Sequence, residues 1–229
     1  MEFHKIAYIK TDFPCKFGIP RQSGLADTKG TIIFEKEYRN IDALRGIEAY
    51  SHLWILWEFS QALRDRWSPT VRPPRLGGNE RVGVFATRSP LRPNPIGMSC
   101  VKLKSVEIDA EYGPILHVTG ADMVDGTPIY DIKPYLPYVD SHPEAKGGFA
   151  EELKGKKLEV VLSQECEELF CEDERRILVQ ILSQDPRPSY QNDPARIYGM
   201  EYAGWEIKFR IEGERLFVCK IEKIKIEKI

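Results

Sequence analysis

The chain has 229 residues, 42% of them hydrophobic and 10% aromatic, which is enough for one large folded domain or for a main domain with a smaller one. Its 33 basic and 35 acidic residues leave a formal net charge of -2, so the overall charge does not indicate a nucleic-acid-binding protein. Five cysteines without a Cys-x-x-Cys pair, no signal peptide and no apolar run of membrane length exclude a secreted disulfide scaffold and a membrane protein, and predict a reduced, cytoplasmic protein.

The first part of the chain reads as a series of short strands with little helix between them. We expect strands over residues 3–10, 31–34, 52–59, 81–87, 98–109 and 115–121. In the third of these, Leu53, Ile55 and Trp57 alternate with residues that face the other way, as in a half-buried strand. Many short strands at such spacing predict an antiparallel barrel or sandwich.

Irregular features are expected between and within these strands. Asp42 is a suitable cap for a short helix that runs through Ala49. The apolar phase shifts between Leu103 and Val106, which predicts a β-bulge, and residues 76–79 read as a Gly-rich turn. No G-x-G-x-x-G string and no alternation of strands and helices is present, so a dinucleotide-binding Rossmann fold is not expected.

A polar segment with one proline and two glycines, residues 140–153, predicts a domain boundary. We therefore divide the chain into a β-barrel domain over 1–140 and a small α+β domain over 150–229. In the second domain we expect a strand over 157–162, helices over 165–170 and 174–182, and a hairpin of strands 205–211 and 215–221.

The most informative segment runs from Arg81 to Ser99. Three of its six residues from 90 to 95 are prolines, which fix the backbone, so the loop is expected to be stiff. Arg88 and Arg92 lie on this loop, and planar cations on a stiff loop suit a site that holds anions or flat rings. From 64 to 92 the chain carries seven arginines, two acids and no lysine. The alternative is a proline-rich surface turn with solvated arginines.

Six further strings stand in order along the chain: 19–22 (Ile-Pro-Arg-Gln), 51–54 (Ser-His-Leu-Trp), 69–78, 122–128 (Asp-Met-Val-Asp-Gly-Thr-Pro), 131–135 and 185–190. Together with the segment 81–99 they resemble the signature of the TsaA-like family, also called TrmO. Members are S-adenosylmethionine-dependent tRNA methyltransferases that methylate N6 of threonylcarbamoyl-adenosine, the modified base next to the anticodon. The resemblance implies a mainly antiparallel β-barrel, a homodimer with packed barrels, and the tRNA anticodon loop as partner.

The resemblance also implies which residues contact S-adenosylmethionine. They are Pro20, Arg21, Gln22, His52, Leu53, Arg88, Cys100, Asp122, Met123, Val124 and Asp125. Taken singly, several have simpler interpretations: His52 as a core histidine, Cys100 as a small core residue, and Asp125-Gly126 as a turn. The four histidines lack ligand spacing with the cysteines, so no metal site is expected.

The chemistry requires a group that takes the N6 proton, because this conjugated nitrogen loses it when it is methylated. Asp125 is the first candidate for this base and Asp131 the second. For Asp131 the alternative is a turn that ends a strand.

RNA recognition is expected to combine arginine–phosphate contacts with aromatic stacking. The candidates are Arg64, Arg66, Trp67, Arg72, Arg75, Arg92, Arg187 and Tyr190. Arg92 or Arg187 could hold the threonyl carboxylate of the modified base. The alternative is that these arginines stabilise their own loops. Two other functions stay open, a non-catalytic tRNA-binding module and a different small-molecule enzyme on the same barrel.

Overall fold

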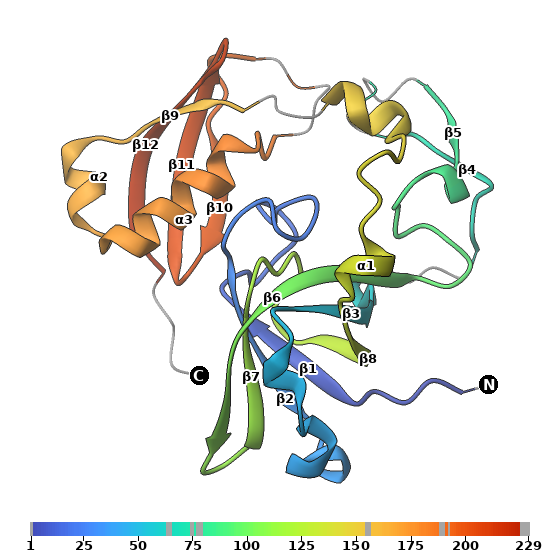
Figure 1. Cartoon of the computed structure of the whole chain (residues 1–229). Coiled ribbons are helices and arrows are strands. Elements are labelled where there is room, and N and C mark those ends of the chain that lie inside the picture. Colours follow the sequence, from blue (N-terminus) through green and yellow to red (C-terminus); the bar gives the residue numbers. More distant parts are fainter. Residues whose placement is uncertain are drawn as a thin grey trace.

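The computed structural model describes residues 2–62, 66–73, 76, 80–153, 157–187, 191 and 193–224. Six strands close into a barrel in the order β1-β2-β7-β6-β3-β8, shown in the lower half of Figure 1. They are β1 (Ala7–Thr11), β2 (Lys29–Phe34), β3 (His52–Glu58), β6 (Ile96–Asp109), β7 (Gly113–Thr119) and β8 (Thr127–Pro134). All neighbours pair antiparallel, which confirms the predicted barrel.

Alternating residues of the barrel strands fill its interior. Leu53 and Ile55 are fully buried and Trp57 nearly so, as the alternation in β3 predicts. They pack with residues from the other strands, among them Ile9 and Leu116. The register between β6 and β7 shifts between Leu103 and Ser105, so the predicted bulge is confirmed.

The connection from β2 to β3 differs from the single helix expected over 42–49. It contains three 3-10 turns, η1 (Lys36–Tyr38), η2 (Ile41–Leu44) and η3 (Ile47–Ala49). Gly46 lies between the last two with a φ of +88°, a left-handed conformation that interrupts any helix. The side chain of Asn40, not of Asp42, caps η2 by accepting a hydrogen bond from the Asp42 N–H.

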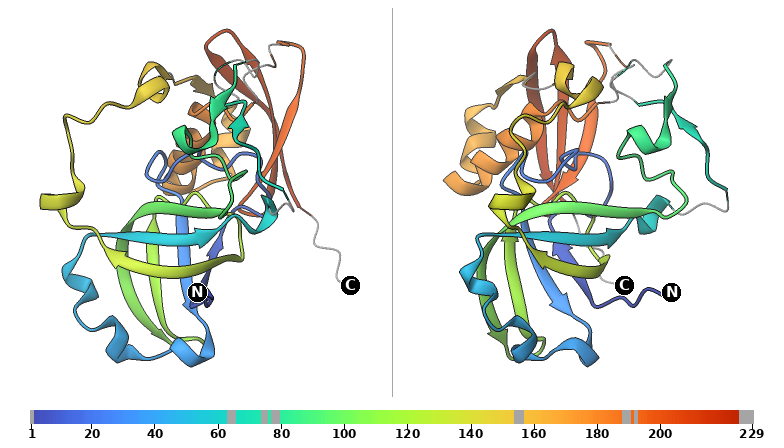
Figure 2. Two further views of the ribbon diagram at one scale, coloured as in Figure 1. Left: turned by 90° about the vertical axis from the view of Figure 1, so that its right-hand side faces the viewer. Right: turned by 45° about the vertical axis from the view of Figure 1, so that its right-hand side comes forward.

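The connection between β3 and β6, residues 59–95, is here called the arm. It contains η4 (Ser60–Ala62), a ribbon of β4 (Thr70–Val71) and β5 (Val82–Gly83), and η6 (Val84–Ala86). The strand expected over 81–87 was wrong beyond Gly83, because β5 has only the two residues of β4 to pair with and the chain then turns. Residues 77–79 of the expected turn lie outside the described residues. The arm stands away from the barrel wall in Figure 1 and in the right-hand view of Figure 2.

The C-terminal part forms a second, smaller sheet of order β10-β11-β12-β9 beside two helices. After α1 (Pro137–Asp140) and η7 (Gly148–Leu153), its elements are β9 (Glu159–Val161), α2 (Gln164–Glu168), α3 (Glu172–Ser183), β10 (Tyr198–Tyr202), β11 (Trp205–Glu212) and β12 (Arg215–Lys223). The expected helices and the hairpin β11–β12 are present, whereas β10 was not predicted. In the part that the structure describes, no helix is long and apolar enough to cross a membrane.

The β1–β2 loop, residues 12–28, joins the two parts. Phe13 and Ala26 of this loop are buried in the C-terminal core, in one cluster with Leu178 and Phe209. The ring of Phe13 lies 5.1 Å from that of Tyr202. The loop therefore connects two barrel strands in the sequence but packs against the C-terminal sheet. Part of it also lies at the end of the barrel, where it lines the cavity described below.

Candidate functional site

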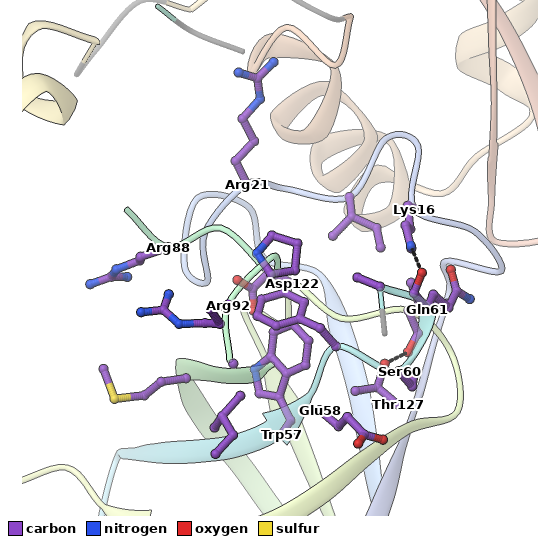
Figure 3. Close-up of a pocket in the computed structure, with 18 of the residues that line it drawn as sticks. Lys16, Arg21, Trp57, Glu58, Ser60, Gln61, Arg88, Arg92, Asp122 and Thr127 are labelled. Carbon is purple, nitrogen blue, oxygen red and sulfur yellow. Dashed lines mark hydrogen bonds between the residues drawn. The ribbon is translucent and has the colours of Figure 1, made fainter. Parts of the chain in front are cut away.

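A cavity of about 590 Å³ lies at the end of the barrel, between the β1–β2 loop and the two ends of the arm. Its lining comes from four stretches far apart in the sequence, 16–22, 57–62, 87–98 and 122–127. Such a concave site with apolar walls and a few polar groups is typical of a small-molecule pocket. Figure 3 shows its main side chains.

Trp57 forms an apolar wall of the cavity, and the strand beside it is built to admit its ring. Trp57 pairs in register with Gly97 of β6. A Cβ atom on Gly97 would lie 2.2 Å from the indole, so only glycine lets the ring lie against the strand. Phe59 packs on the same indole, with ring centroids 4.3 Å apart. The cavity therefore presents an aromatic surface on which a flat ligand could pack.

Asp122 places a half-buried carboxyl group in the cavity lining. Its Oδ1 accepts a hydrogen bond from the Ser99 hydroxyl, and Ser99 accepts one of 2.9 Å from Trp57 Nε1. Burial raises the pKa of Asp122 from 3.8 to about 6, although hydrogen bonds from Ser99 and backbone N–H groups and the charge of Arg88 act in the opposite direction. A carboxyl group so placed can exchange a proton near neutral pH.

Cationic side chains lie on both sides of Asp122. Figure 3 shows Arg88 and Arg92 on one side and Lys16 on the other. Arg88 donates to Gln22 Oε1, Lys16 donates to the Gln61 carbonyl, and Arg92 donates to the Thr87 carbonyl at 3.1 Å. These contacts orient the cations around the cavity, where they can bind an anionic ligand group.

The Arg21 side chain does not point into the centre of the cavity but holds the β1–β2 loop in place. Its guanidinium points away from Asp122 in Figure 3 and donates to the backbone carbonyls of Asp185 and Arg187, at 3.0 and 3.1 Å. Asp27 at the other end of the β1–β2 loop pairs with Arg176 of α3 and accepts from Gln180 at 3.0 Å. The C-terminal part thus holds the loop that carries Pro20 and Gln22 against the cavity.

Of the predicted cofactor residues, the structure brings six to the cavity: Pro20, Arg21, Gln22, Arg88, Asp122 and Val124. The side chains of Leu53 and Met123 are buried in the barrel core, so only their backbones could touch a ligand. His52 lies five residues from Trp57 along β3, roughly 16 Å away at the rise of a strand. Cys100 lies on the outer face of β6, and its N–H donates to Ser23 Oγ at 3.0 Å.

The two predicted bases lie outside the cavity lining. Asp125 is exposed and its Oδ1 accepts from the Thr11 N–H at 2.9 Å, in a turn where Gly126 has a φ of +76°. Asp131 pairs with Lys133 at 2.7 Å on the outer face of β8. Both carboxylates therefore have structural contacts, and the geometry makes Asp122 the better candidate for proton transfer.

The predicted RNA-binding residues separate into three groups. Arg64, Arg75 and Tyr190 lie outside the described residues. Arg66, Trp67 and Arg72 are exposed on the arm, while Arg92 lines the cavity. Arg187 is largely covered and pairs with Asp185 at 3.1 Å, in agreement with the alternative that it stabilises its own loop.

Many of the cavity residues were not among the predicted site residues, and Lys16, Trp57, Phe59 and Thr127 are examples. The alternation placed Trp57 on the buried face of its strand, and an apolar residue at the end of a barrel can line both the core and the cavity. Among the described residues no group of three His, Cys, Asp or Glu side chains could hold a metal ion.

Comparison with known proteins gives matches over nearly the whole chain. The family model described as the tRNA-methyltransferase O N-terminal domain matches residues 8–141, and the TrmO C-terminal domain matches 155–224. A tRNA (adenine(37)-N6)-methyltransferase of Escherichia coli is 43% identical over 217 residues, covering 92% of this chain and 91% of the relative. One of Eikenella corrodens is 48% identical over 165 residues, covering 72% and 92%. A crystal structure of TrmO from Pseudomonas aeruginosa superposes with a TM-score of 0.78 and 32% identity, over 97% of both chains.

Proposed function

This chain belongs to the tRNA-methyltransferase O family, and on that premise we propose that it methylates N6 of adenosine 37 in tRNA with S-adenosylmethionine as methyl donor. The acceptor we propose is the threonylcarbamoyl form of this base. The observation that carries the proposal is the cavity itself, because the family strings at 20–22, 88 and 122–124 converge on it from separate elements. Family membership over both matched regions supports the same reaction.

The residues of the cavity fit S-adenosylmethionine. Trp57 and Phe59 offer apolar surface to a flat base, Asp122 offers a hydrogen-bond acceptor, and Lys16 and Arg88 can bind a carboxylate. When bound, the cofactor supplies a methyl group activated by a sulfonium. The protein contributes alignment and exclusion of water, which is most of what an in-line displacement needs.

We assign proton removal to Asp122, in place of Asp125 or Asp131. The acceptor nitrogen gains a methyl group and gives up its proton, and the ionised Asp122 carboxylate takes that proton. Ser99 fixes the carboxyl through its hydrogen bond, and Trp57 Nε1 fixes Ser99 in turn. A base with a pKa of about 6 is mostly ionised at neutral pH, and its pKa lies close enough to the working pH for it to accept a proton readily.

We propose that the tRNA anticodon loop binds along the arm, with Arg66 and Arg72 on its phosphates and Arg92 near the modified base. Arg66 and Arg72 are exposed and Arg92 lines the cavity, which supports this placement. Several phosphate contacts would make the affinity for tRNA fall steeply with rising salt.

We further propose a cytoplasmic homodimer in which 1–140 and 150–229 act as barrel and support domains. Met98 on the outer face of β6 and Tyr138 and Val139 on α1 are exposed apolar residues that a second copy could cover. Trp54 Nε1 donates to Asp140 at 3.0 Å and so holds α1 against β3. Sedimentation of the wild type and of Tyr138→Ser would test the dimer.

The experiment that tests the function is nucleoside mass analysis of tRNA after incubation with the protein and S-adenosylmethionine. The proposal predicts that threonylcarbamoyl-adenosine gains one methyl group and that ribonuclease mapping places it at position 37. Methylation of another nucleoside, or cofactor binding without methylation of any tRNA, would contradict it.

A further inference from the structure

Two aromatic rings stand together in solvent on the arm. Trp67 is 50% exposed and Phe85 is 72% exposed, and their ring centroids lie 6.1 Å apart at an interplanar angle of 31°. In every other aromatic pair of the described residues at least one ring is buried or half-buried. A soluble protein seldom leaves contiguous apolar rings in water unless they bind something.

The charges around this pair indicate the chemistry of its ligand. The described part of the arm carries five arginines, at 66, 72, 81, 88 and 92, and one acid, Glu80. Arg81 donates to Thr70 Oγ1 at 2.8 Å and so braces the β4–β5 ribbon. Arg66 and Arg72 are exposed, and neither has an acidic partner within the described ranges. Aromatic faces among exposed arginines match a polyanion that carries flat rings, which is single-stranded nucleic acid.

The pair is also connected to the cavity through short stretches of chain. Phe85 lies in η6, two residues before Thr87 and three before Arg88, both of which line the cavity. At the other end of the arm, η4 lines the cavity as well. A nucleic acid on the pair would therefore reach the cavity within a few nucleotides.

We propose that Trp67 and Phe85 form a stacking platform for an unpaired base of the anticodon loop, next to the adenosine that is methylated. Arg66 and Arg72 bind the phosphates on either side of that base. The inference rests on the proposed function for the identity of the RNA. Stacking tolerates any base, so the platform contributes affinity and positioning without reading the sequence.

The test measures binding of a fluorescent anticodon stem-loop RNA to the full-length protein, together with KM and kcat for its methylation. The variant is Trp67→Ala/Phe85→Ala, the conservative variant is Trp67→Phe/Phe85→Tyr, and the control is Ile108→Ala. Ile108 is 64% exposed in β6, so it is an apolar residue outside the arm with an exposure similar to that of the tested rings. All these side chains are exposed, and circular dichroism verifies the fold.

We expect the double alanine variant to raise the Kd for RNA roughly tenfold to a hundredfold, since each stacked base contributes substantially to affinity. KM should rise in parallel, while the affinity for S-adenosylmethionine and the kcat at saturating RNA stay near the wild-type values. The conservative variant should remain within about threefold of wild type, because it retains two aromatic faces. The Ile108→Ala control should bind like wild type.

Two results would overturn the platform. One is an unchanged Kd for RNA in the double alanine variant. The proposed function survives that result if the wild type still methylates the RNA. The other is a loss of affinity accompanied by dissociation of a dimer in sedimentation, which would place the rings in a subunit interface. A wild type that binds the stem-loop through these rings but methylates no tRNA would contradict the proposed function and support the platform.

Discussion

At the scale of single residues, the fold changes the protonation equilibrium of the Asp122 carboxyl group relative to that of a carboxyl group in water. Burial raises its pKa to about 6, and the hydrogen bond from Ser99 limits that rise. Strongly perturbed carboxyl groups in a cavity are candidates for catalysis, and this one lies among aromatic and cationic side chains. Asp122 is therefore the residue on which the proposed chemistry depends most.

The first prediction concerns the pH dependence of methyl transfer. The ionised carboxylate is the active form, so the rate should rise with pH, reach half its maximum near pH 6 and level off above it. Ser99→Ala removes a hydrogen bond that lowers the pKa and should move the midpoint to higher pH. Asp122→Asn should lower kcat by roughly a hundredfold or more. Full activity in Asp122→Asn together with its loss in Asp125→Asn would return the role of base to Asp125.

The same group makes a prediction for stability. The pKa of Asp122 is higher in the folded chain than its ordinary 3.8, so the folded state binds the proton more tightly. The tighter proton binding stabilises the folded state fully below about pH 4, and this stabilisation is lost as the pH rises through about 6. Asp122→Asn should therefore increase the free energy of unfolding at pH 7.5 by about 1–2 kcal/mol, less than the roughly 3 kcal/mol that the pKa shift represents. Urea denaturation at pH 7.5 and pH 4 measures this, and a destabilised variant at pH 7.5 contradicts it.

Gly97 gives a further prediction at this scale. Gly97→Ala would place a methyl group inside contact distance of the Trp57 ring and should cost about 1–3 kcal/mol of stability. The displaced indole should also weaken cofactor binding, measured by calorimetry. Gly83→Ala is the matched control, because a Cβ there meets no atom within 4 Å. Equal stability of the two variants would show that Trp57 moves freely.

At the scale of elements, the β1–β2 loop depends on the C-terminal part for its position. Arg21 donates to both carbonyls from one guanidinium nitrogen, Nη2, which the planar group holds in place and which the shorter, flexible lysine side chain reproduces poorly. Arg21→Lys should raise the Kd for S-adenosylmethionine by roughly threefold to tenfold and leave the pH midpoint unchanged, because it acts through the position of Gln22 and not on Asp122. A changed midpoint with unchanged affinity would contradict this positioning role.

The elements show which features the sequence could predict. Alternation in β3 and the bulge in β6 follow from local patterns, and the barrel from their number and spacing. The strand expected over 81–87 failed because its length depends on β4, whose two residues carry little signal. The family strings located Gln22, Arg88 and Asp122. They could not show that Asp131 faces outward, because a shift of one residue in the register of a strand moves a side chain to the other face of the sheet.

At the scale of the whole molecule, the barrel and the C-terminal part have separate hydrophobic clusters, and the β1–β2 loop contributes Phe13 and Ala26 to the C-terminal one. Phe13 is fully buried among C-terminal residues although it lies only two residues after the end of β1, so the barrel and the C-terminal sheet should unfold together. Phe13→Ala should lower the free energy of unfolding by about 3–5 kcal/mol in one transition. Phe3→Ala, at a residue 58% exposed, is the control and should cost less than about 1 kcal/mol. A small cost for Phe13→Ala, or two separate transitions in denaturant, would contradict this coupling of the two parts through the β1–β2 loop.

The most direct test of the central claim is transfer of labelled methyl from S-adenosylmethionine to two preparations of the same tRNA, one with threonylcarbamoyl-adenosine and one unmodified. We expect label in the modified tRNA and little in the unmodified one, and we expect Asp122→Asn to label the modified tRNA at a rate lower by roughly a hundredfold or more. Equal labelling of both preparations would contradict the threonylcarbamoyl requirement. Label in neither, with the cofactor bound normally, would contradict the proposed tRNA methylation.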